Sequence, residues 1–206
     1  MIKNILFVGP PGSGKGTQIN ELKKYLKFEV ISSGDIVRDL AESDEAIKKT
    51  LESGALVKDE ILIKEVDRRI DQIDPEMGIV FDGFPRNLHQ AEQLDEMLLH
   101  NHDRALDAVV YIYLDEKEVV KRLTIRKVCE KCNRPLYDLS KCPDCGGKPV
   151  IRKDDNEATI INRMQVFLEN TLPLVSYYKT REVLLEINGE QSIEGVARDI
   201  KEGLGL

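Results

Sequence analysis

Two groups of residues in this sequence have the types and the spacing that chemistry requires. The first consists of all four cysteines, which form two Cys-x-x-Cys pairs nine residues apart: Cys129, Cys132, Cys142 and Cys145. The second is the segment GPPGSGKGT at 9–17, which combines closely spaced glycines with a lysine and a hydroxyl residue. The first spacing indicates a metal site and the second a phosphate-binding loop.

The cysteine pairs predict a structural zinc site. Four thiolates in a tetrahedral array suit Zn²⁺, and with all four coordination positions taken by protein no position is left for a substrate. Free thiols and two disulfides are the alternatives, although paired cysteines in a reducing compartment are more often metal ligands. The segment 127–150 holds only a handful of apolar residues, so a metal would replace a hydrophobic core there.

The glycine-rich segment predicts a cradle for phosphate. It follows an apolar run and precedes a segment with helical periodicity, so backbone N–H groups and the positive end of a helix would face one anion. Lys15 can reach the β- and γ-phosphates of a nucleotide, and the Thr17 hydroxyl would lie near Mg²⁺. The strict pattern G-x-x-x-x-G-K-[ST] fails at Gly16, but the loop still meets its physical requirements.

A further group of residues that could do chemistry lies in VFDGFPR at 80–86. The apolar run before Asp82 predicts a buried strand that delivers this carboxylate to the carboxyl edge of a sheet, where open α/β folds bind ligands. An aspartate at that edge can orient water bound to Mg²⁺. Arg86 follows a Gly-Phe-Pro turn, which would hold its side chain rigidly near the same edge.

The rest of the chain must position these groups. Apolar runs bounded by turn residues predict strands at 5–8, 29–31, 79–81, 109–114 and 183–187, the first and fourth covered on both faces. Helical periodicity predicts helices at 17–26, 35–51 (one helix, or two broken near Ser43), 59–73, 90–99, 116–125, 158–178 and 192–202. Since strands and helices alternate, the sequence predicts an α/β fold with a parallel sheet.

Composition limits the classes of partner. The sequence carries 30 basic and 37 acidic residues, a net charge of −7, which argues against nucleic acid as the main partner. No apolar run approaches the ~20 residues that span a bilayer, and the opening MIKNILFVGP is not a secretory signal. We therefore expect a cytoplasmic protein without nucleic-acid or membrane partners.

Taken together, GPPGSGKGT, the stretch ISSGDIVRD at 31–39 and the string DGFPR resemble the motifs of nucleoside monophosphate kinases, the adenylate kinase family foremost. The resemblance covers essentially the whole chain. It implies a three-layer P-loop fold around a five-stranded parallel sheet, and phosphoryl transfer from Mg·ATP to AMP to give two ADP. It also implies a core (1–31, 62–126 and 155–206), a small helical insertion that binds the monophosphate (32–61) and a zinc-binding lid (127–154).

The resemblance also implies which residues contact the acceptor, AMP. The hydroxyl of Ser33, where the family usually has threonine, and the guanidinium of Arg38 would hold the monophosphate. The segment SGALVKDEI at 53–61 would surround the base, and Gln90 would hydrogen-bond to the adenine. The full acceptor set is Ser33, Arg38, Ala55, Leu56, Val57, Gly83, Phe84, Arg86, Gln90, Arg152 and Arg163.

Phosphoryl transfer passes through a loose transition state, so it needs fixed cations more than a nucleophile. The resemblance assigns catalysis to Lys15, Arg86, Arg122, Arg126, Arg152 and Arg163, with Asp154 and Asp155 helping to hold the arginines. It assigns ATP to Gly12, Ser13, Gly14, Lys15, Gly16, Thr17, Arg122, Arg126, Leu136, Tyr137 and Gln191, and Mg²⁺ to Thr17 and Asp82 through water. The cysteine pairs are closer together than in the usual zinc lid.

Two alternatives stay open at this point. A related nucleoside monophosphate kinase could use GTP as donor, or UMP or CMP as acceptor. A P-loop ATPase or switch with a zinc-ribbon binding module is the other, although a guanine-reading NKxD motif is absent and the charge does not support a basic binding face. The histidines, His89, His100 and His102, are predicted to be surface residues, and the resemblance implies a monomer.

Overall fold

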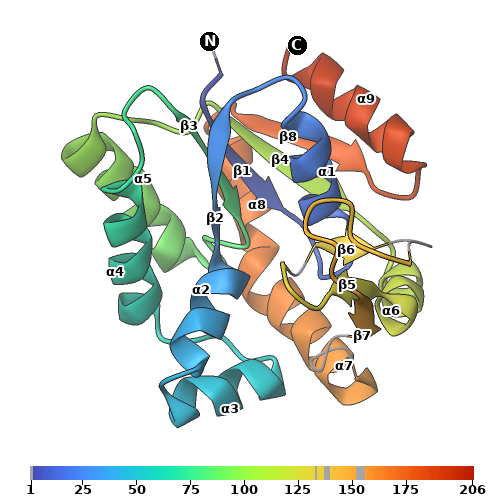
Figure 1. Cartoon of the computed structure of the whole chain (residues 1–206). Coiled ribbons are helices and arrows are strands. Elements are labelled where there is room, and N and C mark those ends of the chain that lie inside the picture. The colour runs from blue at the N-terminus through green and yellow to red at the C-terminus, as the bar shows by residue number, and fades with distance from the viewer. Residues whose placement is uncertain (1, 133, 137–139, 152–155) are drawn as a thin grey trace.

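The computed structural model of the chain describes residues 2–132, 134–136, 140–151 and 156–206. At its centre lies a five-stranded sheet in the order β2-β3-β1-β4-β8, in which every neighbouring pair is parallel (Figure 1). The strands are β1 (Asn4–Val8), β2 (Phe28–Ser32), β3 (Gly78–Asp82), β4 (Ala108–Tyr113) and β8 (Leu184–Asn188). The predicted α/β fold and its five parallel strands are therefore confirmed.

Helices cover both faces of this sheet and complete three layers. On one face, α1 (Lys15–Leu22) and α9 (Ile193–Gly203) pack apolar residues such as Ile19 and Ile200 against Phe7 and Val110. The other face is covered by α4 (Asp59–Ile70), α5 (Leu88–His102) and α8 (Pro173–Lys179). Strand β1 is buried at all five positions because both layers cover it, as its continuous apolar run predicts.

Two groups of smaller elements lie beside the sheet. Between β2 and α4 come α2 (Ser33–Ala41) and α3 (Glu45–Ser53), two helices rather than one because Asp44 accepts from the first amides of α3. Between α6 (Glu116–Ile125) and α7 (Glu157–Val166) lies a three-stranded antiparallel sheet of β5 (Lys127–Cys129), β6 (Pro135–Leu136) and β7 (Pro149–Ile151). Figure 1 shows both groups at the end of the main sheet remote from the two termini.

Two predictions about local structure need correction. The helix expected over 158–178 contains a π-helical turn, η1 (Phe167–Thr171), between α7 and α8, which a search for a 3.6-residue period does not show. His102 is not a surface residue, because its side chain is only 9% exposed and lies 2.8 Å from the Asp67 carboxylate on α4. The other two histidines, His89 and His100, are exposed as expected.

Within the part of the chain that the structure describes, no helix has both the length and the apolar character that a membrane crossing needs.

Candidate active site

The predicted chemistry gathers around one cleft of about 530 Å³ at the carboxyl edge of the main sheet. Its walls come from the glycine-rich loop after β1, the turn after β3, α2, α6, α7 with η1, and residues in and beside β6 of the small sheet. Residues singled out from the sequence that line it are Gly12, Gly14, Lys15, Gly16, Thr17, Arg38, Ala55, Asp82, Gly83, Arg86, Arg122, Arg126, Cys132 and Arg163.

The glycine-rich loop presents an amine and the start of a helix to this cleft. Gly14 adopts a left-handed conformation with φ of 95° directly before α1, and among the described residues no side chain caps that helix. The Lys15 amine donates to the carbonyl oxygens of Gly9 at 2.7 Å and of Pro10 at 3.0 Å. The first backbone amides of α1 and the Lys15 amine therefore form a concentrated positive site for a phosphate group.

Lys15 is also the residue whose ionisation the cleft changes most clearly. Burial lowers the pKa of its amine to about 8; Asp82 opposes this shift, and the nearby guanidinium groups of Arg86, Arg163 and Arg126 add to it. A phosphate anion beside Lys15 would favour the protonated, charged form of the amine, and this charge would in turn attract the phosphate.

Asp82 ends β3 and lies in the cleft opposite Lys15. Burial raises the pKa of its carboxyl group, while the neighbouring Lys15 and Arg86 partly counteract that rise. The hydroxyl residue Thr17 lines the same cleft. A carboxylate and a hydroxyl are the oxygen donors that Mg²⁺ prefers, directly or through water, so these two residues fit the ion that accompanies a nucleotide.

Arg86 is fixed at the cleft by the turn that precedes it. Its guanidinium donates from Nε to the Gly83 carbonyl at 2.8 Å and from Nη2 to Ser33 Oγ at 3.1 Å. The Ser33 hydroxyl donates in turn to the same Gly83 carbonyl at 2.5 Å. Gly83 has φ of 72°, and a Cβ there would lie 2.9 Å from Ser33 Oγ, so only glycine suits the position.

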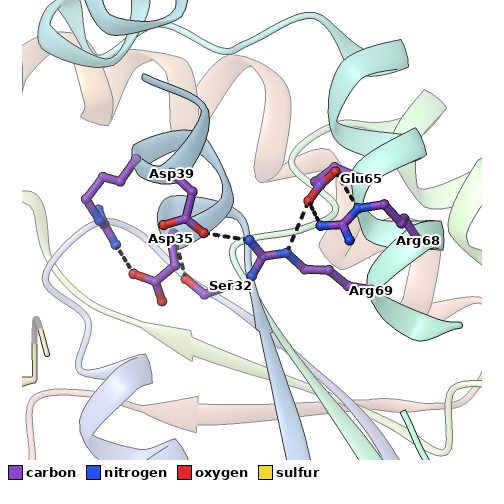
Figure 2. A network of polar contacts seen from close by, with 7 residues as sticks. Ser32, Asp35, Asp39, Glu65, Arg68 and Arg69 are labelled. Atoms are coloured by element: carbon purple, nitrogen blue, oxygen red, sulfur yellow. Dashed lines mark hydrogen bonds and ion pairs between the residues drawn. The ribbon is translucent and has the colours of Figure 1, made fainter. Parts of the chain in front are cut away.

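Arg38 reaches the cleft from α2 with a carboxylate beside it. Its Nη2 donates to Asp35 Oδ1 at 2.6 Å, and the Asp35 amide donates to Ser32, which caps the helix. Figure 2 shows Asp39, one residue after Arg38, paired with Arg69 of α4, whose Nη2 lies 2.7 Å from Asp39 Oδ2. Helix α2 is thus tied to α4 by an ion pair directly behind the arginine.

A third arginine, Arg122, is held on the wall formed by α6. Its Nε donates to Glu118 on the preceding turn of α6 at 3.0 Å, and its Nη2 donates to the Gly189 carbonyl after β8 at 2.9 Å. Arg126, at the end of α6, and Arg163, on α7, line the same space. Cations from four helices and from the turn after β3 therefore converge on one cleft, as the binding of several phosphates requires.

Beside the cleft, the four cysteine sulfurs form a compact cluster, all within 4.8 Å of one another. The Sγ atoms lie 3.3 Å apart in Cys129–Cys145, 3.5 Å apart in Cys132–Cys145 and 3.6 Å apart in Cys132–Cys142. These separations are well beyond an S–S bond of about 2.05 Å and close to the roughly 3.8 Å expected around a tetrahedral Zn²⁺. The cluster therefore fits a four-thiolate metal site rather than two disulfides.

Comparison with known proteins agrees with this geometry. The family model described as adenylate kinase matches residues 7–183. The chain belongs to the adenylate kinase family. It is 41% identical to the adenylate kinase of Archaeoglobus fulgidus, with 96% of each chain covered. The adenylate kinase of Thermotoga petrophila is 39% identical over 100% of this chain and 98% of that protein.

Not every residue that the adenylate kinase family resemblance assigned reaches the cleft wall. Gln90 is fully buried, with Nε2 donating to Asp59 at 2.6 Å and Oε1 accepting from the Arg86 amide at 2.7 Å. Gln191 donates to Asn188 and Asp199. The other assigned residues that the structure places behind the wall are Ser13, Ser33, Leu56, Val57, Phe84 and Leu136. Tyr137, Arg152, Asp154 and Asp155 lie outside the described residues.

Several residues that line the cleft were not predicted from the sequence. Arg134, two residues after Cys132, forms an ion pair with Asp144, which directly precedes Cys145. Both residues line the cleft, but in the sequence they resemble ordinary surface charges. Pro135 faces the cleft, whereas its neighbour Leu136 packs with Cys129 and Cys142. The remaining unpredicted wall residues include Asn20, Lys23, Asp35, Val166, Phe167 and Thr171. Of these six, Asp35 alone lies within one of the motifs, ISSGDIVRD at 31–39.

Proposed function

We propose that this chain catalyses reversible phosphoryl transfer from Mg·ATP to AMP, giving two ADP. The observation that carries the proposal is the convergence of Lys15, Arg38, Arg86, Arg122, Arg126 and Arg163 on one cleft. ATP and AMP together bring four phosphates, and a transition state that spreads charge over the transferred group needs cations on every side. Arg152 is proposed to join this set.

The cleft offers two positions for phosphate, one for each nucleotide. At one, the amides that open α1 and the Lys15 amine would hold the β- and γ-phosphates of the donor. At the other, Arg38 and the Arg86 guanidinium, which Ser33 and Gly83 orient, would hold the acceptor's monophosphate. Arg122 and Arg126 would neutralise charge between the two. Their fixed positions, rather than a nucleophilic side chain, would lower the barrier.

Two segments would close over the nucleotides and exclude water, so that AMP rather than water accepts the phosphoryl group. We assign the acceptor side to 32–61, which includes α2, α3 and the cleft residue Ala55. We assign the donor side to a lid at 127–154, whose Pro135 lies beside the glycine-rich loop: a Cβ on Gly16 would be 4.0 Å from the proline ring. Leu136, Tyr137 and Gln191 remain proposed contacts of the donor base, and Gln90 of the acceptor base.

Two metal ions accompany the proposal. The four cysteines would hold Zn²⁺, which gives the lid the stability that its small apolar cluster cannot supply. Thr17 and Asp82 would hold Mg²⁺ through water, and that ion would neutralise charge on the donor phosphates. We further propose that the protein acts as a monomer in the cytoplasm, where thiols stay reduced and available to the metal.

The test is a matrix of donors (ATP, GTP) against acceptors (AMP, UMP, CMP) with purified protein and Mg²⁺, read by nucleoside diphosphate formation. We expect ATP with AMP to give the highest kcat/KM. Highest activity with GTP, UMP or CMP would replace the proposal with a sibling kinase. Phosphate release from ATP that does not depend on any monophosphate would replace it with an ATPase.

A further inference from the structure

The helix that follows the small cysteine sheet touches the acceptor side of the cleft through one hydroxyl group. Thr171 Oγ1 donates to the backbone carbonyl of Arg86 at 2.8 Å, although the two residues are 85 positions apart. The Thr171 side chain is buried, with 8% of its surface exposed, and it lines the cleft together with Val166 and Phe167. It is therefore packed at the back of the position proposed for the acceptor's phosphate.

Thr171 is the last residue of the π-helical turn η1. In this turn the Leu172 amide donates to the Phe167 carbonyl, five residues back, at 2.8 Å, and Asn170 Nδ2 bonds across it to the Val166 carbonyl at 3.1 Å. A π turn holds one residue more than an α turn, so it rotates the side chains that follow it. Such turns are uncommon and occur often at functional sites. In Figure 1, α7 and α8 form one long orange column that carries this turn past the end of the sheet.

The contact completes a set of bonds that surround Arg86. The Arg86 amide donates to Gln90 Oε1 at 2.7 Å, and its guanidinium donates to Gly83 and Ser33. Those three partners come from the turn itself, α5 and α2. Thr171 adds a partner on the carbonyl side of Arg86, from a helix on the other side of the cleft. Both peptide groups that flank the Arg86 Cα are thereby held.

We propose that Thr171 is a positioning residue for Arg86, and that the π-helical turn η1 places the Thr171 hydroxyl within hydrogen-bonding distance of the Arg86 carbonyl. The inference rests on the proposed function, since it takes Arg86 as a ligand of the acceptor's phosphate. Loss of the hydroxyl would let the Arg86 backbone shift, and the guanidinium would move with it. The donor position at Lys15 should be affected much less, because the bonds in this set join the turn, α2, α5 and η1, whereas the Arg86 charge is only one of several that act on the Lys15 amine.

The experiment compares Thr171→Val, which removes the donor with little change of shape, with Thr171→Ser, which keeps it. We expect Thr171→Val to lower kcat/KM for AMP about three- to tenfold, the effect of one neutral hydrogen bond, and to leave KM for ATP unchanged. Thr171→Ser should restore most of the activity. The matched control is Thr180→Val, because the exposed Thr180 makes a similar bond to the Tyr177 carbonyl at 2.8 Å away from the cleft.

A double-mutant cycle separates positioning from general stability. If Thr171 acts through Arg86, adding Thr171→Val to the Arg86→Lys variant should lower its activity little further. Full additivity of the two losses, unchanged kinetics in Thr171→Val, or equal losses toward ATP and AMP would each overturn the inference. If Thr171→Val does not fold, Thr171→Ala removes the same donor and is judged by the same results. Failure of the wild-type protein to form ADP would instead contradict the proposed function.

Discussion

Asn162 of α7 and Ser53, the last residue of α3, are joined by a hydrogen bond from Asn162 Nδ2 to the Ser53 carbonyl at 2.7 Å. One turn earlier, Thr159 Oγ1 donates to the Glu52 carbonyl at 3.2 Å. These carbonyls end a helix and have no partner within it, so α7 satisfies them. Gly54 makes the close approach feasible, because a Cβ there would lie 2.8 Å from the Arg163 side chain. Helix α7 therefore holds both a cleft arginine and the proposed acceptor-binding segment.

Loss of this contact should loosen α3. We expect Asn162→Ala to speed amide hydrogen exchange in α3 and to raise KM for AMP about two- to fivefold, because one hydrogen bond no longer favours the docked position. The measurement is hydrogen exchange by mass spectrometry together with AMP titrations. Gln165→Ala is the control, since Gln165 is an exposed amide on the same helix whose Nε2 donates to Glu169 at 2.9 Å rather than to α3. Equal exchange in α3 for both variants would contradict this role.

Arg86 should matter to activity far more than to folding. We expect Arg86→Ala to lower kcat/KM for AMP by about 100-fold or more, because a charge-assisted contact with the transferring phosphates is lost in a water-poor cleft. Its unfolding midpoint should stay close to that of the wild type. The comparison is with Arg198→Ala, which removes an exposed arginine of α9. Near-wild-type ADP formation by Arg86→Ala would remove Arg86 from the catalytic set.

The charged Lys15 amine should lower the free energy of unfolding near neutral pH, although the proposed reaction requires it. Since burial lowers its pKa to about 8, from 10.5 for an ordinary lysine, the folded state carries an unfavourable charge below pH 8. That cost is relieved as pH rises from about 8 toward 10.5, because the amine then loses its proton in the folded protein first. We expect Lys15→Met to abolish activity and to raise the free energy of unfolding at pH 7 by about 1–3 kcal/mol.

The pH dependence gives the Lys15 prediction a sharper test. Urea unfolding of wild type and Lys15→Met at pH 7 and pH 9.5 should show a stability gap that narrows at the higher pH. Lys49→Met, at an exposed position of α3, provides the control and should show no such gap. A gap that widens with pH would mean that the Lys15 amine is not desolvated in the folded state.

Much of this architecture could be predicted from local sequence. Continuous apolar runs identify strands buried on both faces, and β1 is such a strand. The loop before α1 and the turn after β3 carry their functional side chains within a few residues of a strand end. In a parallel sheet all strand ends of one kind share an edge, so Lys15, Asp82 and Arg86 had to meet there.

Other features depend on long-range packing that local patterns do not record. The bond from Thr171 to Arg86 requires a π turn, and one added residue in a helix barely alters its apolar period. In the short strand β6, Pro135 faces the cleft and Leu136 the cysteine cluster, because adjacent strand residues point to opposite faces. A one-residue difference in alignment therefore decides which side chain faces the cleft, where the donor nucleotide is proposed to bind.

The cysteine cluster leads to a prediction about metal retention. Gly147 lies two residues after the last cysteine, Cys145, and a Cβ on it would lie 2.5 Å from Cys129 Sγ. A Cβ on Gly146, the residue between them, would meet nothing within 4 Å. We expect wild-type protein to contain one zinc per chain by elemental analysis, and Gly147→Ala to lose it to a chelator much faster. Gly146→Ala is the matched control: it adds the same methyl group at a position of φ 69°, which strains the backbone but brings no atom against the sulfurs.

Removal of the metal, by chelation or by Cys142→Ser, should melt the proposed lid at lower temperature than the core, since the cluster of Cys129, Leu136 and Cys142 is too small to hold it. A metal-free protein with an intact lid, or equal zinc loss from both glycine variants, would contradict this account.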